Sequence, residues 1–146
     1  MVTKRRLPVL KAPGGDDADA PSRAPWQWVA FGALAIFVAW LPLAFLATWG
    51  ASSLHGSGAS PVTSVVVLAV GLALAALAGG FLVGRWGAAG VGVREAALSG
   101  LASAVVASAL AFGAPGAAWG AVVTVLVAVP FAALGGALGL RRRRGG

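Results

Sequence analysis

Few residues in this chain could take part in chemistry, and the clearest group is Glu95 with Arg85 and Arg94. They are the only charged residues between the long apolar segments described below. An acidic group beside two cations at the edge of a membrane could bind a cation or a proton. However, Glu95 falls in the first turn of a predicted helix, where the helix dipole favours a carboxylate. We therefore predict that Glu95 starts this helix and pairs with Arg85 or Arg94.

The second group is His55 with the serines around it, in the Gly/Ser-rich segment 50–60. A Ser/His dyad needs both side chains fixed within hydrogen-bond reach, together with an oxyanion site. A glycine- and serine-rich loop predicts neither. The chain has no cysteine and a single histidine, and it contains no metal-ligand spacing or phosphate-binding loop. We predict that the protein is not an enzyme and binds no cofactor or metal.

The elements that position these residues are apolar throughout. Of the 146 residues, 59% are hydrophobic and 10% are charged, too few to form the polar shell of a soluble domain. Apolar runs of about 18 or more residues indicate membrane spans. We predict a single all-α domain over 26–140, an up-down four-helix transmembrane bundle. Its spans are about 26–49, 61–84, 95–112 and 117–140, with Ser60 as N-cap and Pro61 opening the second.

The positive charge of the chain predicts its topology. The segments before the first span, between the second and third, and after the fourth hold five, two and four Lys or Arg residues. The other two loops hold none. Because basic residues concentrate in cytoplasmic loops, both termini should be cytoplasmic and the protein should lie in the cell inner (plasma) membrane. Segment 1–25, rich in proline, is predicted to be a disordered cytoplasmic tail, and 141–146 a basic cytoplasmic tail.

The same charge predicts the partners. A net charge of +7 could indicate nucleic-acid binding, but the basic residues flank apolar spans, so we expect none. The partner is instead the lipid bilayer. Arg141, Arg142, Arg143 and Arg144 should lie among anionic lipid headgroups.

Two glycine pairs carry the clearest packing signal. Gly80 and Gly84 end the second predicted span, and Gly135 and Gly139 end the fourth. Lipid provides little hydrophobic drive between helices, so close backbone approach at small residues must hold them together. We predict that both pairs pack against another helix of the bundle or against another subunit. The hydroxyls of Ser99, Ser103 and Thr124 can add interhelical hydrogen bonds of about 0.6 kcal/mol each.

The two glycine pairs also lie in similar sequence. Residues 77–85 and 134–141 each carry a Gly-x-x-x-Gly step just before an arginine, and both spans run in the same direction. One hypothesis is that 26–85 and 95–141 are helical hairpins related by duplication. The alternative is that segments rich in glycine and alanine match by chance.

The stretches Gly79-Gly-Phe-Leu-Val-Gly-Arg85 and Glu95-Ala-Ala-Leu-Ser-Gly100-Leu carry a family resemblance. They resemble small prokaryotic four-span membrane proteins of unknown function, which have a Gly-Gly-x-x-x-Gly patch ending span 2. The resemblance covers about residues 76–105. It implies a four-helix integral membrane protein and supplies no activity or functional residue.

No predicted span carries an ionisable residue at its centre, where proton-coupled transporters and voltage sensors need one. The sequence therefore favours a non-enzymatic membrane protein that acts through helix packing with itself or another membrane protein. A small permease or channel subunit, or a hole-forming protein, stays open as the alternative.

Overall fold

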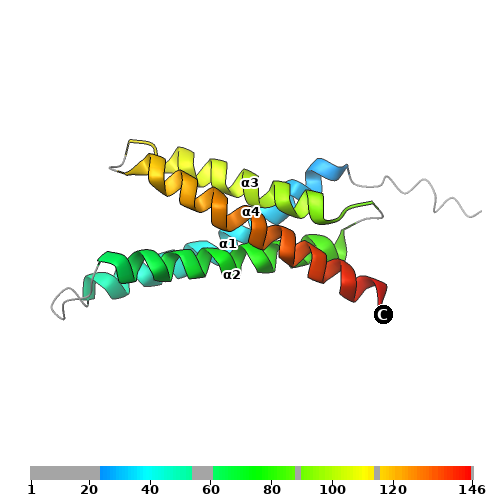
Figure 1. Ribbon diagram of the computed structural model, residues 1–146, viewed down its shortest axis with the longest axis horizontal. Helices are drawn as coiled ribbons and strands as arrows, with labels where there is room; N and C mark the ends of the chain where they lie inside the picture. Colours follow the sequence, from blue (N-terminus) through cyan, green and yellow to red (C-terminus); the bar gives the residue numbers. More distant parts are fainter. Residues whose placement is uncertain (1–23, 54–60, 88–89, 114–115, 146) are drawn as a thin grey trace, which may run out of the picture.

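The computed structural model describes residues 24–53, 61–87, 90–113 and 116–145. Within these ranges the fold is all-helical, as predicted, and contains four helices (Figure 1). They are α1 (Pro25–Ser53), α2 (Pro61–Trp86), α3 (Val93–Leu110) and α4 (Ala117–Arg144). Helix α2 begins at Pro61, the residue expected to open the second span.

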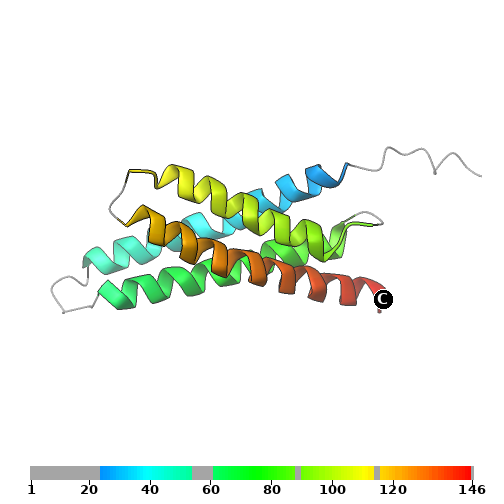
Figure 2. The same cartoon turned by 45° about the horizontal axis from the view of Figure 1, so that its top comes forward.

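The helices alternate in direction and form two hairpins, α1–α2 and α3–α4 (Figure 2). At one end α1 and α3 begin while α2 and α4 finish; we call this the arginine end, after Arg85 and Arg141–Arg144. The opposite end, where α1 and α3 finish, is called the turn end. All four helices are long and apolar enough to cross a membrane. The chain is thus a multi-pass membrane protein, and the predicted four-helix bundle is confirmed.

Helix α3 is the weakest of the four candidate membrane spans. It is the least apolar and has 18 residues, which cover about 27 Å at 1.5 Å per residue. That length barely matches a hydrocarbon core of about 30 Å. Helix α3 therefore depends on its neighbours, and it packs on α1, α2 and α4.

The C-terminal boundary differs from the sequence prediction. Helix α4 continues through Arg144, so the four arginines expected in a tail form the last helical turn. Arginine is a good helix former, and the negative end of the helix dipole favours cations there, which explains the extension. Most of the predicted N-terminal tail, and also His55, Ser60 and Gly146, lie outside the described residues.

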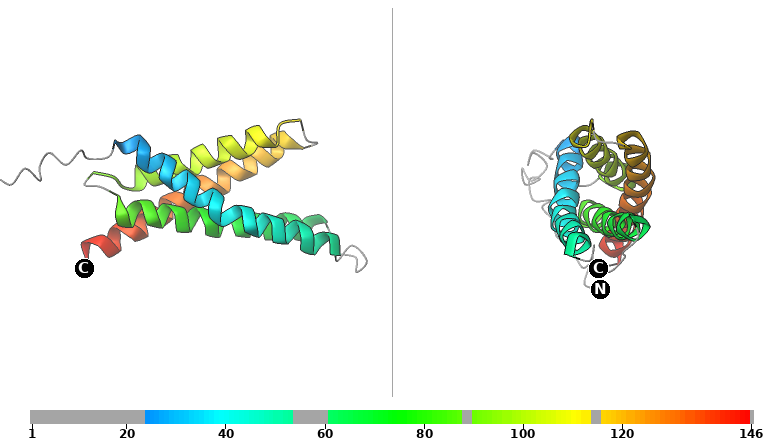
Figure 3. Two further views of the ribbon diagram at one scale, coloured as in Figure 1. Left: turned by 180° about the vertical axis from the view of Figure 1, so that it is seen from behind. Right: turned by 90° about the vertical axis from the view of Figure 1, so that its left-hand side faces the viewer.

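The core of the bundle is built from small side chains. Apart from Ile36, its main cluster consists of alanines: Ala75, Ala76, Ala104, Ala128 and Ala132. Helix α4 crosses α2, and at the turn end α1 and α2 lie apart from α3 and α4 (Figures 1 and 3). Close packing is therefore concentrated at the crossing and toward the arginine end.

Candidate helix-packing site

The candidate site begins with the contact between α2 and α4, where backbone meets backbone. A Cβ atom on Gly80 would lie less than 3.0 Å from the carbonyl group of Ala132. A Cβ on Gly84 would lie equally close to the carbonyl oxygen of Gly136. Real Cβ atoms essentially never approach other atoms so closely, so only glycine allows this crossing.

The contact is reciprocal. A Cβ on Gly135 would meet the carbonyl oxygen of Leu77, and one on Gly139 would meet that of Phe81. Each glycine thus faces the residue three positions before the matching glycine of the other helix. The structure brings the two predicted glycine pairs together, against each other and inside one chain.

Further small residues, which the sequence analysis did not select, extend this contact to the other helices. Gly79 lies against Ile36 of α1, and Gly136 lies against Ala96 of α3. Gly100 of α3 faces the Ala128 carbonyl group of α4. The glycine doublets at 79–80 and 135–136 were the sequence feature that could have predicted these additional contacts. Adjacent residues on a helix point about 100° apart, so a doublet permits close contact with two neighbours.

Ser99 and Ser103 are both buried on α3, and they have different roles. The Ser99 hydroxyl donates to the Glu95 carbonyl oxygen of its own helix at 2.8 Å. The Ser103 hydroxyl donates to the Ser99 carbonyl oxygen at 2.9 Å and lies 3.4 Å from that of Ala33 on α1. Thr124 bonds within α4. Of the three predicted interhelical hydrogen bonds, the structure contains that of Ser103.

The charged groups at the arginine end contact backbone atoms. The Glu95 carboxylate accepts a 2.7 Å hydrogen bond from the Gly92 N–H group and so caps the start of α3. Arg85 donates to the Arg142 carbonyl oxygen at 3.3 Å. The structure thus brings Glu95 to a backbone amide, and its pairing with Arg85 or Arg94 stays a prediction.

The four terminal arginines do not share one environment. Arg141, Arg142 and Arg144 are exposed, and their place among lipid headgroups stays a prediction. Arg143 is half-buried and donates a 2.6 Å hydrogen bond to the Gly87 carbonyl oxygen, just beyond the end of α2. This bond and that of Arg85 tie the ends of α2 and α4 together beyond the glycine contact.

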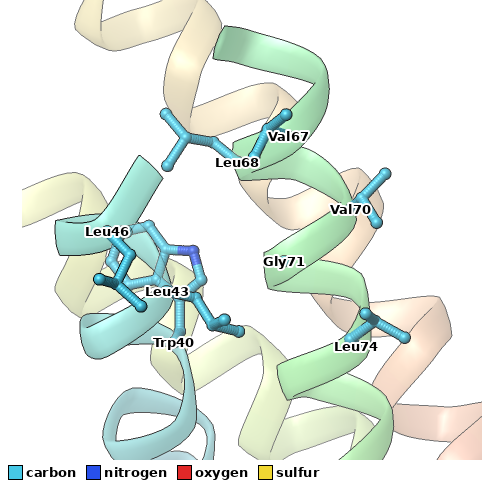
Figure 4. A pocket seen from close by; sticks show the side chains of 9 residues that line it. Trp40, Leu43, Leu46, Val67, Leu68, Val70, Gly71 and Leu74 are labelled. Carbon is cyan, nitrogen blue, oxygen red and sulfur yellow. The ribbon is translucent and has the colours of Figure 1, made fainter. Parts of the chain in front are cut away.

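Toward the turn end the packing is looser, and Trp40 of α1 fills the space between helices. It lines two cavities of about 390 Å³ each and a third of about 30 Å³. Figure 4 shows its indole ring between α1 and α2, beside Leu43 and facing Gly71. Its Nε1 atom is buried, and no acceptor from the described part of the chain reaches it. Of the described residues, Trp40 is therefore the one side chain common to the linings of these three pockets.

Comparison with known proteins adds no relative: no family model, no curated protein and no solved structure matches this chain. The class follows from the fold alone. This is a multi-pass membrane protein whose two helical hairpins are held together by glycine contacts.

Proposed function

We propose that this protein is a non-enzymatic integral membrane protein that acts through helix packing, with a second copy of itself as the partner. The observation that carries the proposal is an unused face of α1. Only 11% of the α1 span is buried, against 22–28% of the other three spans. Five of its exposed large side chains follow one another in alternating steps of three and four residues, at Phe31, Leu34, Val38, Leu41 and Phe45. We call this set the α1 stripe.

The α1 stripe suits a second copy of the same helix. Alternating steps of three and four keep a row of side chains on one side of a helix, the pattern by which two helices interlock at about 20°. Two identical stripes are self-complementary around a two-fold axis. The α2–α4 glycines, in contrast, already contact each other, so they offer no free close-packing face to another chain.

Self-association should weaken when the α1 stripe loses its large side chains. The chain lacks cysteine, so Gly145→Cys provides one labelling site for energy transfer between copies in liposomes. Leu34→Ala with Leu41→Ala should raise the dissociation constant about tenfold, a loss of about 1.4 kcal/mol. The matched control is Leu126→Ala with Leu134→Ala on α4. These leucines are 68% and 54% exposed, close to the 63% and 55% of Leu34 and Leu41.

Two results would refute self-association through α1. One is an equal effect of the two double variants, and the other is no energy transfer between wild-type copies at any lipid dilution. The same liposomes test the alternative. Solute flux that appears only with the protein would favour a permease, a channel subunit or a hole-forming protein.

We also propose that the protein lies in the plasma membrane and that both of its termini are on the cytoplasmic side. All basic residues of the described ranges lie at the arginine end: Arg85, Arg94 and Arg141–Arg144. Basic residues favour the cytoplasmic side. In intact cells, the Gly145→Cys variant should resist a membrane-impermeant maleimide and react only after the cells are opened. Labelling in intact cells would reverse the proposed topology.

A further inference from the structure

Helices α1 and α3 both begin at the arginine end (Figure 2). A groove lies between the start of α1 and the first three to four turns of α3. Its volume is about 730 Å³. Trp26 and Val29 line it from α1, and Leu98, Leu101 and Val105 line it from α3. These helices face lipid, so the apolar wall is open to the bilayer. The apolar lining of the groove suits an acyl chain.

The polar end of the groove carries one positive and one negative side chain. Arg94 and Glu95 both line it, in the first turn of α3. Arg94 is exposed, and Glu95 is half-buried. The Oε2 atom of Glu95 accepts the Gly92 N–H group, and a carboxylate has a second oxygen and further lone pairs. An apolar channel therefore ends in two adjacent, opposite charges.

We propose that this groove binds a phospholipid whose headgroup joins a phosphate to a primary ammonium, as in phosphatidylethanolamine. The phosphate lies against the Arg94 guanidinium, which can bind it through two parallel hydrogen bonds. The ammonium donates to the Glu95 carboxylate, and one acyl chain follows the apolar wall. Trp26 is 66% exposed at this end, where indole rings settle at headgroup level.

The charge pair separates this headgroup from the two common alternatives. A choline headgroup has the phosphate but no N–H group to donate to Glu95. A glycerol headgroup has the phosphate and no cation, so Glu95 would lie beside a net negative charge. Charge-assisted hydrogen bonds contribute more than neutral ones, so both differences should reduce binding.

Lipid binding to the purified full-length protein can be measured by native mass spectrometry, with the three lipids at equal concentration. The wild-type protein should retain phosphatidylethanolamine about tenfold better than phosphatidylcholine or phosphatidylglycerol. Arg94→Gln should remove most binding of phosphatidylethanolamine and phosphatidylglycerol alike. Glu95→Gln keeps an oxygen acceptor for the Gly92 N–H group. It should lower the binding of phosphatidylethanolamine alone, to the level of phosphatidylcholine binding. Arg144→Gln, which removes an exposed charge at the same end, is the control and should change nothing.

Two results would overturn the proposal. Equal retention of the three lipids by the wild-type protein would do so without any variant. Equal losses in Arg94→Gln and Arg144→Gln would show general attraction to basic residues instead of a site. The site is separate from the α1 stripe, so lipid binding and self-association can fail independently.

Discussion

Gly80→Ala is expected to lower the free energy of unfolding by about 2 kcal/mol or more, although it adds one methyl group. The new Cβ would lie less than 3.0 Å from the O, C and Cα atoms of Ala132. These are backbone atoms of a helix, which cannot rotate away as a side chain can. Helices α2 and α4 must therefore move apart, and that movement also weakens the contacts of Gly84, Gly135 and Gly139.

The loss can be measured by titrating the protein in micelles with a denaturing detergent and following helix content. Gly120→Ala is the matched control, because Gly120 lies in α4 and a Cβ there would meet nothing within 4 Å. This variant should gain about 0.5–1 kcal/mol, since alanine favours the helix over glycine. If Gly80→Ala were as stable as Gly120→Ala, the glycine contact would not hold α2 and α4 together.

A second measurement tests whether the contact acts as one unit. Gly135→Ala should cost about as much as Gly80→Ala, because its Cβ would meet the Leu77 carbonyl group. Once the methyl group added by one substitution has moved α2 and α4 apart, the methyl group added by the other no longer clashes. The double variant should therefore lose less than the sum of the two single losses.

The fold followed from the sequence because lipid allows few alternatives. A membrane-spanning chain must satisfy its backbone hydrogen bonds internally, so long apolar runs predict helices almost directly. The steps of four residues between Gly80 and Gly84, and between Gly135 and Gly139, placed each pair on one helix face. Spacing alone left open which helix each face meets. That choice depends on how four helices pack at once, which no local pattern records.

One contact was beyond prediction for the same reason: Arg143 reaches Gly87, which depends on how the end of α4 lies against the end of α2. The Glu95 carboxylate caps its own helix, in the first turn where the sequence placed it. Trp40 did leave a signal that the sequence analysis did not use. Five of the six tryptophans lie near the ends of the predicted spans, and Trp40 lies well inside the first.

The reciprocal glycine contacts bear on the duplication hypothesis. Gly80 faces Ala132, which precedes Gly135 by three residues; Gly135 faces Leu77, which precedes Gly80 by three residues. Gly84 and Gly139 repeat the relation with Gly136 and Phe81. Two parallel helices related by a local two-fold axis would give this pattern. The pattern supports paired hairpins, while duplication itself stays a prediction.

Trp40→Ala is expected to lower the free energy of unfolding by about 3 kcal/mol. Trp40 lines three pockets, of about 390, 390 and 30 Å³, so removing its ring enlarges the empty space where packing is already loose. Lipid supplies little hydrophobic drive, so the cost comes from lost van der Waals contacts in a half of the bundle without close glycine contacts. Trp86→Ala is the control, because Trp86 is 62% exposed and should lose far less.

Trp40→Phe tests the contribution of the aromatic ring separately from that of the indole N–H group. The buried Nε1 atom finds no acceptor among the described residues, and a buried donor without a partner costs about 1–3 kcal/mol. Phenylalanine keeps most of the ring and removes that cost, so this variant should be at least as stable as the wild type. A loss as large as that of Trp40→Ala would mean that the N–H group is hydrogen-bonded in the membrane.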